Sequence, residues 1–251
     1  MDYLFEDFTE FEYETLLRLA KKKWRFIKYS EYRSDYSVIL WRHDLDFSVH
    51  RALRLAQMES GLGVRSTFFL SPHSTFYNLF EPEIKNIVLQ IKGLGHNFGL
   101  HFDPTFYLGM INDLKDVDDI LGFEKSILEK IFLMEVDAFS IHNPDLAALP
   151  ELEQDEIGGM VNASGPFLKE NYSYISDSNG YWRFRRLKDV LEAGEDERLH
   201  VLTHPGWWVP DVMSPRLRVS RCIDGRAGNQ HARYDRILAR LGRDNVGKKA
   251  S

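Results

Sequence analysis

The fold is decided by residues 36–46, which read YSVILWRHDLD. A strand as apolar as the first half of this stretch is most easily buried on both faces, as in a parallel sheet that helices cover. Side chains at alternate positions of a strand point the same way, so Asp44 and Asp46 are expected on one side of the backbone. Two carboxylates this close repel each other unless a cation or a shared proton separates them. The stretch therefore predicts a buried strand with a functional site at its end.

Strands and helices alternate along the rest of the chain. Apolar runs predict strands at residues 39–46, 66–70, 97–103, 137–142 and 199–204, with weaker candidates at 160–163 and 172–176. Helices are predicted over residues 1–30 and at 49–60, 83–93 and 113–134. This alternation is typical of a parallel sheet. About seven strands without a glycine-rich phosphate loop favour a closed or nearly closed barrel over a dinucleotide-binding sheet.

The chain is long enough for one sizeable core, because it has 251 residues of which 43% are hydrophobic. We therefore predict the α/β fold class, with a distorted (β/α) barrel as a single domain over residues 1–251. Within it, residues 1–30 are expected to form an N-terminal helical addition, and residues 242–251 a frayed polar tail.

Charge and cysteine content narrow the class of protein. A net charge of −6 and a pI near 5.9 give no sign of a nucleic-acid partner, which would require a basic surface. The single cysteine, Cys222, is expected in a loop; it excludes an intrachain disulfide framework and suits a reducing compartment. The acidic N-terminus lacks a signal-peptide core, and no apolar stretch approaches the roughly 18 residues that a membrane span needs. A soluble cytoplasmic protein is expected.

Polar side chains stand where the predicted strands end. The carboxyl ends of the strands in a parallel α/β barrel converge on one face, which is where active sites lie. Carboxylates and imidazoles together fit Zn²⁺, with Fe²⁺, Co²⁺ and Mn²⁺ as less favoured choices. The residues at these ends are Asp44, Asp46, His101, Asp103, His142, Asp177 and His204.

Each of these residues also has a structural interpretation. A histidine that ends a strand commonly makes a capping hydrogen bond, and Asp46 is placed to cap the helix that follows it. His43 and His200 point away from Asp44 and Val201, respectively, and are therefore assigned to packing. The coincidence of several such residues at strand ends favours a functional site.

Two motifs, RHDLD at residues 42–46 and GHNFGLH at residues 95–101, resemble the polysaccharide deacetylase (NodB-type carbohydrate esterase) superfamily, and most closely its WbmS-type, O-antigen-locus branch. The resemblance covers roughly residues 36–210. It implies that Asp44 is a general base, that Asp46 and His101 bind a metal ion, and that His204 in LTHP (residues 202–205) is a general acid.

The chain departs from this family at Thr105, where a second metal-binding histidine is usual. His142 is the favoured replacement because imidazole restores the ligand type, and Asp103 is the alternative third ligand. The resemblance further implies that Asp177 and Trp182 either orient the base or form the wall of the substrate pocket, where they are candidate substrate contacts. Trp182 and Trp207 are candidates for stacking on sugar rings, although tryptophans are just as often core residues.

The resemblance implies hydrolysis of an amide or ester by a water that a divalent metal, most plausibly Zn²⁺, activates. An N-acylated sugar or nucleotide-sugar is the expected substrate, as in surface polysaccharide biosynthesis. Two alternatives stay open. One is a catalytically degenerate barrel that binds carbohydrate without hydrolysis, which Thr105 supports. The other is a metal-dependent hydrolase of cyclic amides.

Overall fold

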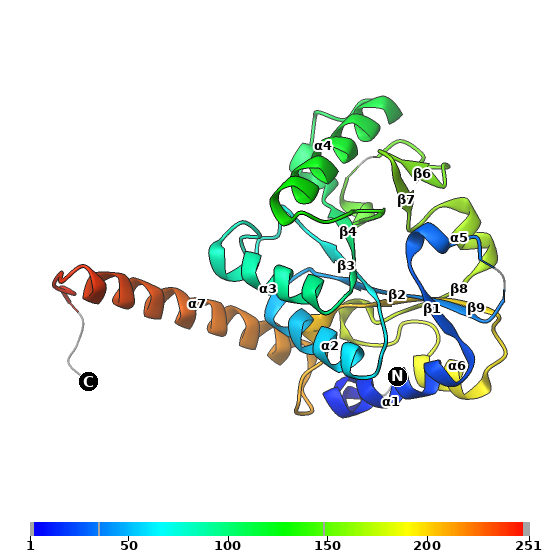
Figure 1. Cartoon of the computed structure of the whole chain (residues 1–251), viewed down its shortest axis with the longest axis horizontal. Helices are drawn as coiled ribbons and strands as arrows, with labels where there is room; N and C mark the ends of the chain where they lie inside the picture. The colour runs from blue at the N-terminus through cyan, green and yellow to red at the C-terminus, as the bar shows by residue number, and fades with distance from the viewer. Residues whose placement is uncertain (1–2, 35, 148, 248–251) are drawn as a thin grey trace.

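One mostly parallel sheet forms the centre of the fold in a computed structural model, which describes residues 3–34, 36–147 and 149–247 (Figure 1). The strands lie in the order β6-β7-β5-β4-β3-β2-β9-β8, and β1 pairs with the first half of β2. All pairings are parallel except that of β6 with β7. The strands are β1 (Arg25–Ile27), β2 (Val38–Asp44), β3 (Thr67–Leu70), β4 (Asn97–Phe102), β5 (Ala138–Ile141), β6 (Glu156–Ile157), β7 (Met160–Asn162), β8 (Ser173–Ser176) and β9 (Arg198–Thr203).

The sheet is curled into a half-barrel, which confirms the predicted α/β class. Within the described residues no strand pairing joins β8 to β6 or β7, so the barrel is open on that side. The short helix α5 (Pro166–Asn171) connects β7 to β8 instead. Its Leu168 packs with Leu40, Phe69 and Val161 in a cluster that fills the concave face.

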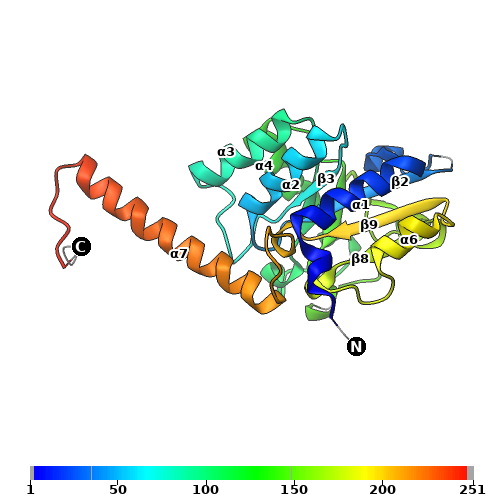
Figure 2. The same cartoon turned by 90° about the horizontal axis from the view of Figure 1, so that it is seen from below.

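Helices cover the convex face of the sheet (Figures 1 and 2). Some of them begin with a side-chain cap: Ser48 accepts the backbone N–H of Arg51, and Asp113 accepts that of Asp116. The other helices are α1 (Glu10–Lys23), α2 (Val49–Gly61), α3 (Pro82–Gly93), α4 (Leu114–Phe132), α6 (Leu187–Ala193) and α7 (Pro215–Arg240).

Two predictions about helices are wrong. The first helix ends at Lys23, and residues 25–27 form β1 because they extend the sheet beside β2. Cys222 lies in α7 and not in a loop; Ser214 caps this helix and Pro215 occupies its first position, where proline is well tolerated. In the predicted tail, residues 242–247 are non-helical and mostly exposed, and residues 248–251 lie outside the described residues. In the described part of the chain no helix is long and apolar enough to cross a membrane.

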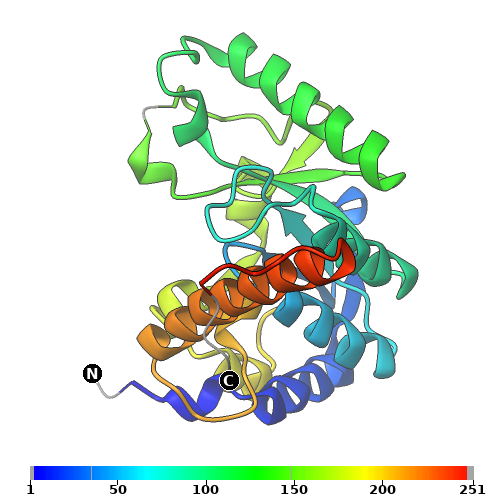
Figure 3. The same cartoon turned by 90° about the vertical axis from the view of Figure 1, so that its left-hand side faces the viewer.

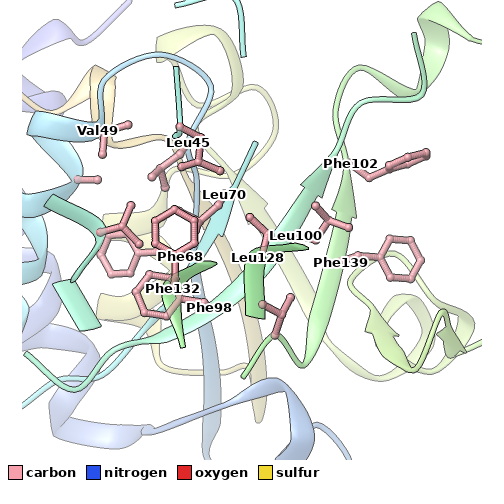
Figure 4. Packing of buried hydrophobic residues seen from close by; sticks show 14 of the residues in the cluster. Leu45, Val49, Phe68, Leu70, Phe98, Leu100, Phe102, Leu128, Phe132 and Phe139 are labelled. Atoms are coloured by element: carbon pink, nitrogen blue, oxygen red, sulfur yellow. The ribbon is translucent and has the colours of Figure 1, made fainter. Parts of the chain in front are cut away.

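β2 is buried along its whole length, as its apolar sequence predicts. Its odd-numbered side chains, such as Ile39 and Trp41, pack under the helices, and its even-numbered ones face the concave side. On the helix side, aromatic and leucine side chains from β3, β4 and α4 interlock (Figure 4). Each such side chain contributes about 1.5–3 kcal/mol when it is fully buried, so this layer holds the strand ends in fixed positions.

Candidate active site

The predicted site residues converge at the carboxyl ends of β2, β4, β5 and β9. β4 pairs with β5 so that His101 lies opposite Ser140, and β2 pairs with β9 so that His43 lies opposite Thr203. β3, between β2 and β4, brings the ring of Phe69 against Gly99. A Cβ at Gly99 would lie 2.6 Å from that ring, so only glycine fits here. The ring thus forms part of the floor beneath His101.

Asp46, His101 and His142 form a group that is suited to a metal ion. Each offers one ligand atom, and these atoms lie within 4.8 Å of one another. His101 Nε2 is 3.0 Å from Asp46 Oδ1, and both atoms are buried without a hydrogen-bond partner in the described part of the chain. Two atoms that bind one ion at about 2 Å stand about 3 Å apart, so this unsatisfied pair fits a divalent metal.

The orientation of His101 is fixed from its other ring nitrogen. Nδ1 forms a 2.8 Å hydrogen bond with the hydroxyl of Ser140 on the neighbouring strand. Such outer partners hold a metal-binding imidazole in place and select its tautomer. Ser140 was not identified from the sequence, although its place two residues before His142 puts it on the same face of β5.

Asp103, which the sequence leaves open as an alternative third ligand, forms hydrogen bonds within the turn after β4. Its Oδ1 accepts hydrogen bonds from the backbone N–H of Thr105, at 2.9 Å, and from the Thr105 hydroxyl, at 2.6 Å. Its Oδ2 is 3.6 Å from His142 Nδ1. Asp103 therefore caps the turn that follows β4 and stands behind His142, while His142 joins Asp46 and His101.

Asp44 lies beside this group and is paired with a buried cation. Arg42 Nη2 is 3.2 Å from Asp44 Oδ2, and both side chains are almost fully buried. Asp44 Oδ2 is also 3.5 Å from His101 Nδ1, whereas Asp44 Oδ1 has no partner in the described part of the chain. Burial lowers the pKa of Arg42, but Asp44 and neighbouring tyrosines outweigh it and raise the pKa above its usual range. The guanidinium thus pairs with one oxygen of Asp44, while the other oxygen has no partner among the described residues.

His204 stands on the other side of Asp46 and is held by Asp177. His204 Nδ1 lies 2.6 Å from Asp177 Oδ1, and the indole N–H of Trp208 donates to Asp177 Oδ2 at 3.0 Å. His204 Nε2 is 3.6 Å from Asp46 Oδ2. Burial lowers the pKa of His204, but Asp46 and Asp177 outweigh it and raise this pKa to about 9. The imidazole therefore carries a proton at neutral pH and presents Nε2 to the site.

The charge pairing that raises the pKa of His204 lowers the pKa of Asp46. Burial raises its pKa, but His204 and His101 outweigh burial and hold the pKa well below its usual range. Asp46 is thus an ionised carboxylate, the form that binds a metal ion.

None of the three predicted substrate contacts belongs to the group of Asp46, His101 and His142. Asp177 is fully buried behind His204, so it orients the histidine and cannot reach a substrate. Trp182 packs on Phe8, and its indole N–H donates to Asp7, which places it in the packing around α1. Trp207 is 9% exposed and its ring packs on Phe47. Both tryptophans therefore pack as core residues, which is the alternative that the sequence leaves open.

No family model and no curated protein matches the chain. Among solved structures it resembles the chitin deacetylase from Colletotrichum lindemuthianum, at 14% identity over 77% of this chain and 84% of that chain, with a TM-score of 0.43. A family 4 acetyl xylan esterase from Clostridium thermocellum, solved with a cobalt ion, matches at 12% identity over 82% of this chain and 92% of that chain, with a TM-score of 0.41.

A third similar structure is a CE4 family pseudoenzyme from Bacillus anthracis, at 13% identity and a TM-score of 0.42. It aligns over 76% of this chain and 60% of that chain. At this level of identity and overlap, the function of the chain has to be inferred from its own side chains.

Proposed function

We propose that this protein is a metal-dependent hydrolase that removes an acyl group from the nitrogen of an amino sugar or nucleotide-sugar. The observation that carries the proposal is the unsatisfied pair of Asp46 Oδ1 and His101 Nε2, with His142 beside it. Buried polar atoms are normally hydrogen-bonded, and two facing orphans cost stability unless a ligand joins them. Zn²⁺ suits the donor set of one carboxylate and two imidazoles.

The surrounding residues supply the proton transfers of hydrolysis. A divalent cation held by Asp46, His101 and His142 would polarise the acyl oxygen and lower the pKa of a nearby water. Asp44, which pairs with Arg42 through Oδ2, accepts the proton of the attacking water through its other oxygen, Oδ1. His204, kept protonated by Asp177, donates a proton to the leaving amine.

The assignment agrees with the motif resemblance to the polysaccharide deacetylase superfamily, and we propose a place for the chain in its WbmS-type branch. In that reading His142 replaces the histidine that is missing at Thr105. We extend the proposal to a role in surface polysaccharide biosynthesis inside the cytoplasm, with single-domain organisation over residues 1–251.

The test is metal analysis followed by an assay. Wild-type protein is purified, reconstituted with Zn²⁺, Co²⁺ or Mn²⁺, and compared with Asp46→Ala, His101→Ala and His142→Ala. We expect one equivalent of metal in the wild type and loss of binding in each variant. Release of free amine from N-acyl sugars and nucleotide-sugars is then measured with the loaded protein.

Two results would decide against the proposal. Wild type that binds no metal even after reconstitution would favour a degenerate barrel that binds carbohydrate without hydrolysis. Metal-loaded protein that hydrolyses cyclic amides but no N-acyl sugar would move the activity to that other class. Circular dichroism of each variant separates loss of metal from loss of fold.

A further inference from the structure

The long helix α7 is attached to the body of the protein by its first half. Arg226 of α7 pairs with Glu81, and Asn229 donates to Glu83, both at the start of α3. Beyond Asn229 the helix extends away from the sheet and from the other helices (Figures 1 and 2). Figure 3 views the molecule from that side, and the end of α7 lies in front of the rest. We call residues 230–241 the distal arm.

Apolar side chains form a stripe along this part of α7. Tyr234, Ile237 and Leu241 are spaced by three and four residues, so they lie on one face of the distal arm. Ile223, about three turns before Tyr234, continues the stripe toward the body. These four residues are between 47% and 59% exposed. A contiguous apolar surface of this kind marks an interaction site.

The charge of α7 is opposite to that of the whole chain. The helix contains seven arginines and two aspartates, with no lysine or glutamate, whereas the chain carries a net charge of −6. Arg233, Arg236 and Arg240 are exposed and share one face of the distal arm. Arg233 lies four residues before Ile237 and Arg240 three residues after it, so the basic face adjoins the apolar stripe. The distal arm is therefore a basic amphipathic helix on an acidic protein.

An anionic lipid surface is the partner that matches both features. The apolar side chains of such a helix enter the boundary between head groups and acyl chains, while arginines on its flank reach the lipid phosphates. Tyr234 suits this boundary because its ring is apolar and its hydroxyl is polar. A nucleic acid would neutralise the arginines but leave the apolar stripe in water. A second copy of α7 would cover the stripe but double the positive charge.

We infer that the distal arm of α7 binds the surface of a membrane that contains anionic phospholipids, and lies along that surface without spanning the bilayer. The pairing of Arg226 with Glu81 ties the arm to the body, so the whole protein is brought to the membrane. This inference does not depend on the proposed hydrolase activity.

The test is co-sedimentation of the full chain with phospholipid vesicles. One set of vesicles is pure phosphatidylcholine, and the other contains phosphatidylcholine and phosphatidylglycerol in equal parts. The apolar variant combines three changes in the stripe, Tyr234→Gln, Ile237→Gln and Leu241→Gln.

Two further variants separate local charge from net charge. The basic variant removes the three exposed arginines of the distal arm, Arg233→Gln, Arg236→Gln and Arg240→Gln. The matched control makes the same change of charge at three exposed arginines of the body, Arg18→Gln, Arg25→Gln and Arg183→Gln. All the substituted side chains are exposed, and circular dichroism checks that each variant keeps its helix content.

We expect the wild type to bind the anionic vesicles but not the neutral ones, and to be released from them at high salt. The apolar variant and the basic variant should each bind at least about tenfold more weakly. The control variant should bind like the wild type.

Three results would overturn the inference. If the wild type binds no anionic vesicles, the arm has another partner, and a dimer in light scattering that the apolar variant dissociates would identify a second copy. An apolar variant that binds like the wild type would reduce the contact to adsorption by charge alone. A control variant as weak as the basic variant would attribute binding to net charge. Metal content is measured without vesicles, so the proposed function and this inference can fail separately.

Discussion

Two polar clusters lie on opposite faces of β2, and neighbouring residues connect them. His43 belongs to a closed cluster under the helices, which consists of Tyr13, His43, Glu59, Ser66, His96 and Thr203. Asp44 belongs to the site cluster on the concave face, which consists of Asp44, Asp46, His101, His142, Asp177 and His204. Both contain histidines and buried carboxylates, so composition does not distinguish them.

The two clusters differ in whether their buried polar atoms have hydrogen-bond partners. In the closed cluster Glu59 accepts from Tyr13, from His43 at 2.7 Å and from Ser66 at 2.6 Å, while the other ring nitrogen of His43 bonds the hydroxyl of Thr203. Its side chains leave no buried polar atom without a partner in the described residues, whereas Asp44, Asp46 and His101 each leave one. A buried network whose polar atoms all have hydrogen-bond partners stabilises the fold, whereas buried polar atoms without partners are stabilised by a bound ligand.

The largest effect is expected at Asp44. Asp44→Asn keeps the size and burial of the side chain but cannot accept a proton, so turnover should fall by about 10²–10⁴-fold. Metal content, measured by elemental analysis, should remain at one equivalent. Full activity on an identified substrate would show that the base has been assigned to the wrong residue.

Glu59→Ala tests the other face of the strand. The change leaves His43, Ser66 and Tyr13 without their buried acceptor, and loss of one member of such a network costs about 3–5 kcal/mol. Urea denaturation measures the free energy of unfolding, with Asp44→Asn as the control. Folded Glu59→Ala protein that has lost its metal would contradict a purely structural role for the closed cluster.

Stability should fall in acid because two histidines outside the site are buried. Burial lowers the pKa of His96, against a raising effect of Glu59, and burial with Arg42 lowers the pKa of His200. The unfolded chain, with a histidine pKa of about 6.5, then binds more protons than the folded one. The free energy of unfolding should therefore decrease as pH falls below about 6.5, by at most about 1.4 kcal/mol per pH unit for each histidine.

Urea denaturation between pH 5 and 8 measures this dependence. His96→Gln should lower the slope in acid by the share of one histidine. An unchanged slope in this variant would mean that His96 is protonated in the folded protein.

The smallest effect is expected at Asp103. Asp103→Ala removes the acceptor for Thr105 and so should cost about 1 kcal/mol, as loss of a cap does. The metal stoichiometry should stay the same, whereas His142→Ala should lose the metal. The reverse pattern, with metal lost from Asp103→Ala alone, would make Asp103 the third ligand.

Much of the fold could be predicted from the sequence because strand ends and helix starts are local signals. The buried strand before the site, the helix that begins at Val49 and the strand that carries His101 all follow from short apolar runs, although the first strand ends at Asp44 and not at residue 46, and Ser48, not Asp46, caps the helix. The extent of barrel closure could not be predicted, since it depends on whether β8 pairs with the far edge of the sheet.

The site could be predicted only in part, for a similar reason. Alternation along β2 places Asp44 and Asp46 together, but the choice between His142 and Asp103 as the proposed third ligand depends on how the turn after β4 uses Asp103. Arg42 lies two residues before Asp44 on the same face, and this spacing was the one signal for its role. The position of His43 in the strand predicts a packing residue. No pattern in the sequence predicts that Glu59 of α2 contacts it.

The long helix α7 has a consequence for solution behaviour. At about 1.5 Å per residue, its 26 residues extend about 39 Å, and Arg218 in its first turn is its one buried residue. A helix with so little packing depends on its own backbone hydrogen bonds. Amide protons of its distal half should therefore exchange with deuterium almost as in a free peptide, while those of β2 wait for global unfolding. Trypsin should accordingly cut first in the distal half of α7, at Arg233, Arg236 or Arg240, and leave the sheet and the candidate active site on one large fragment.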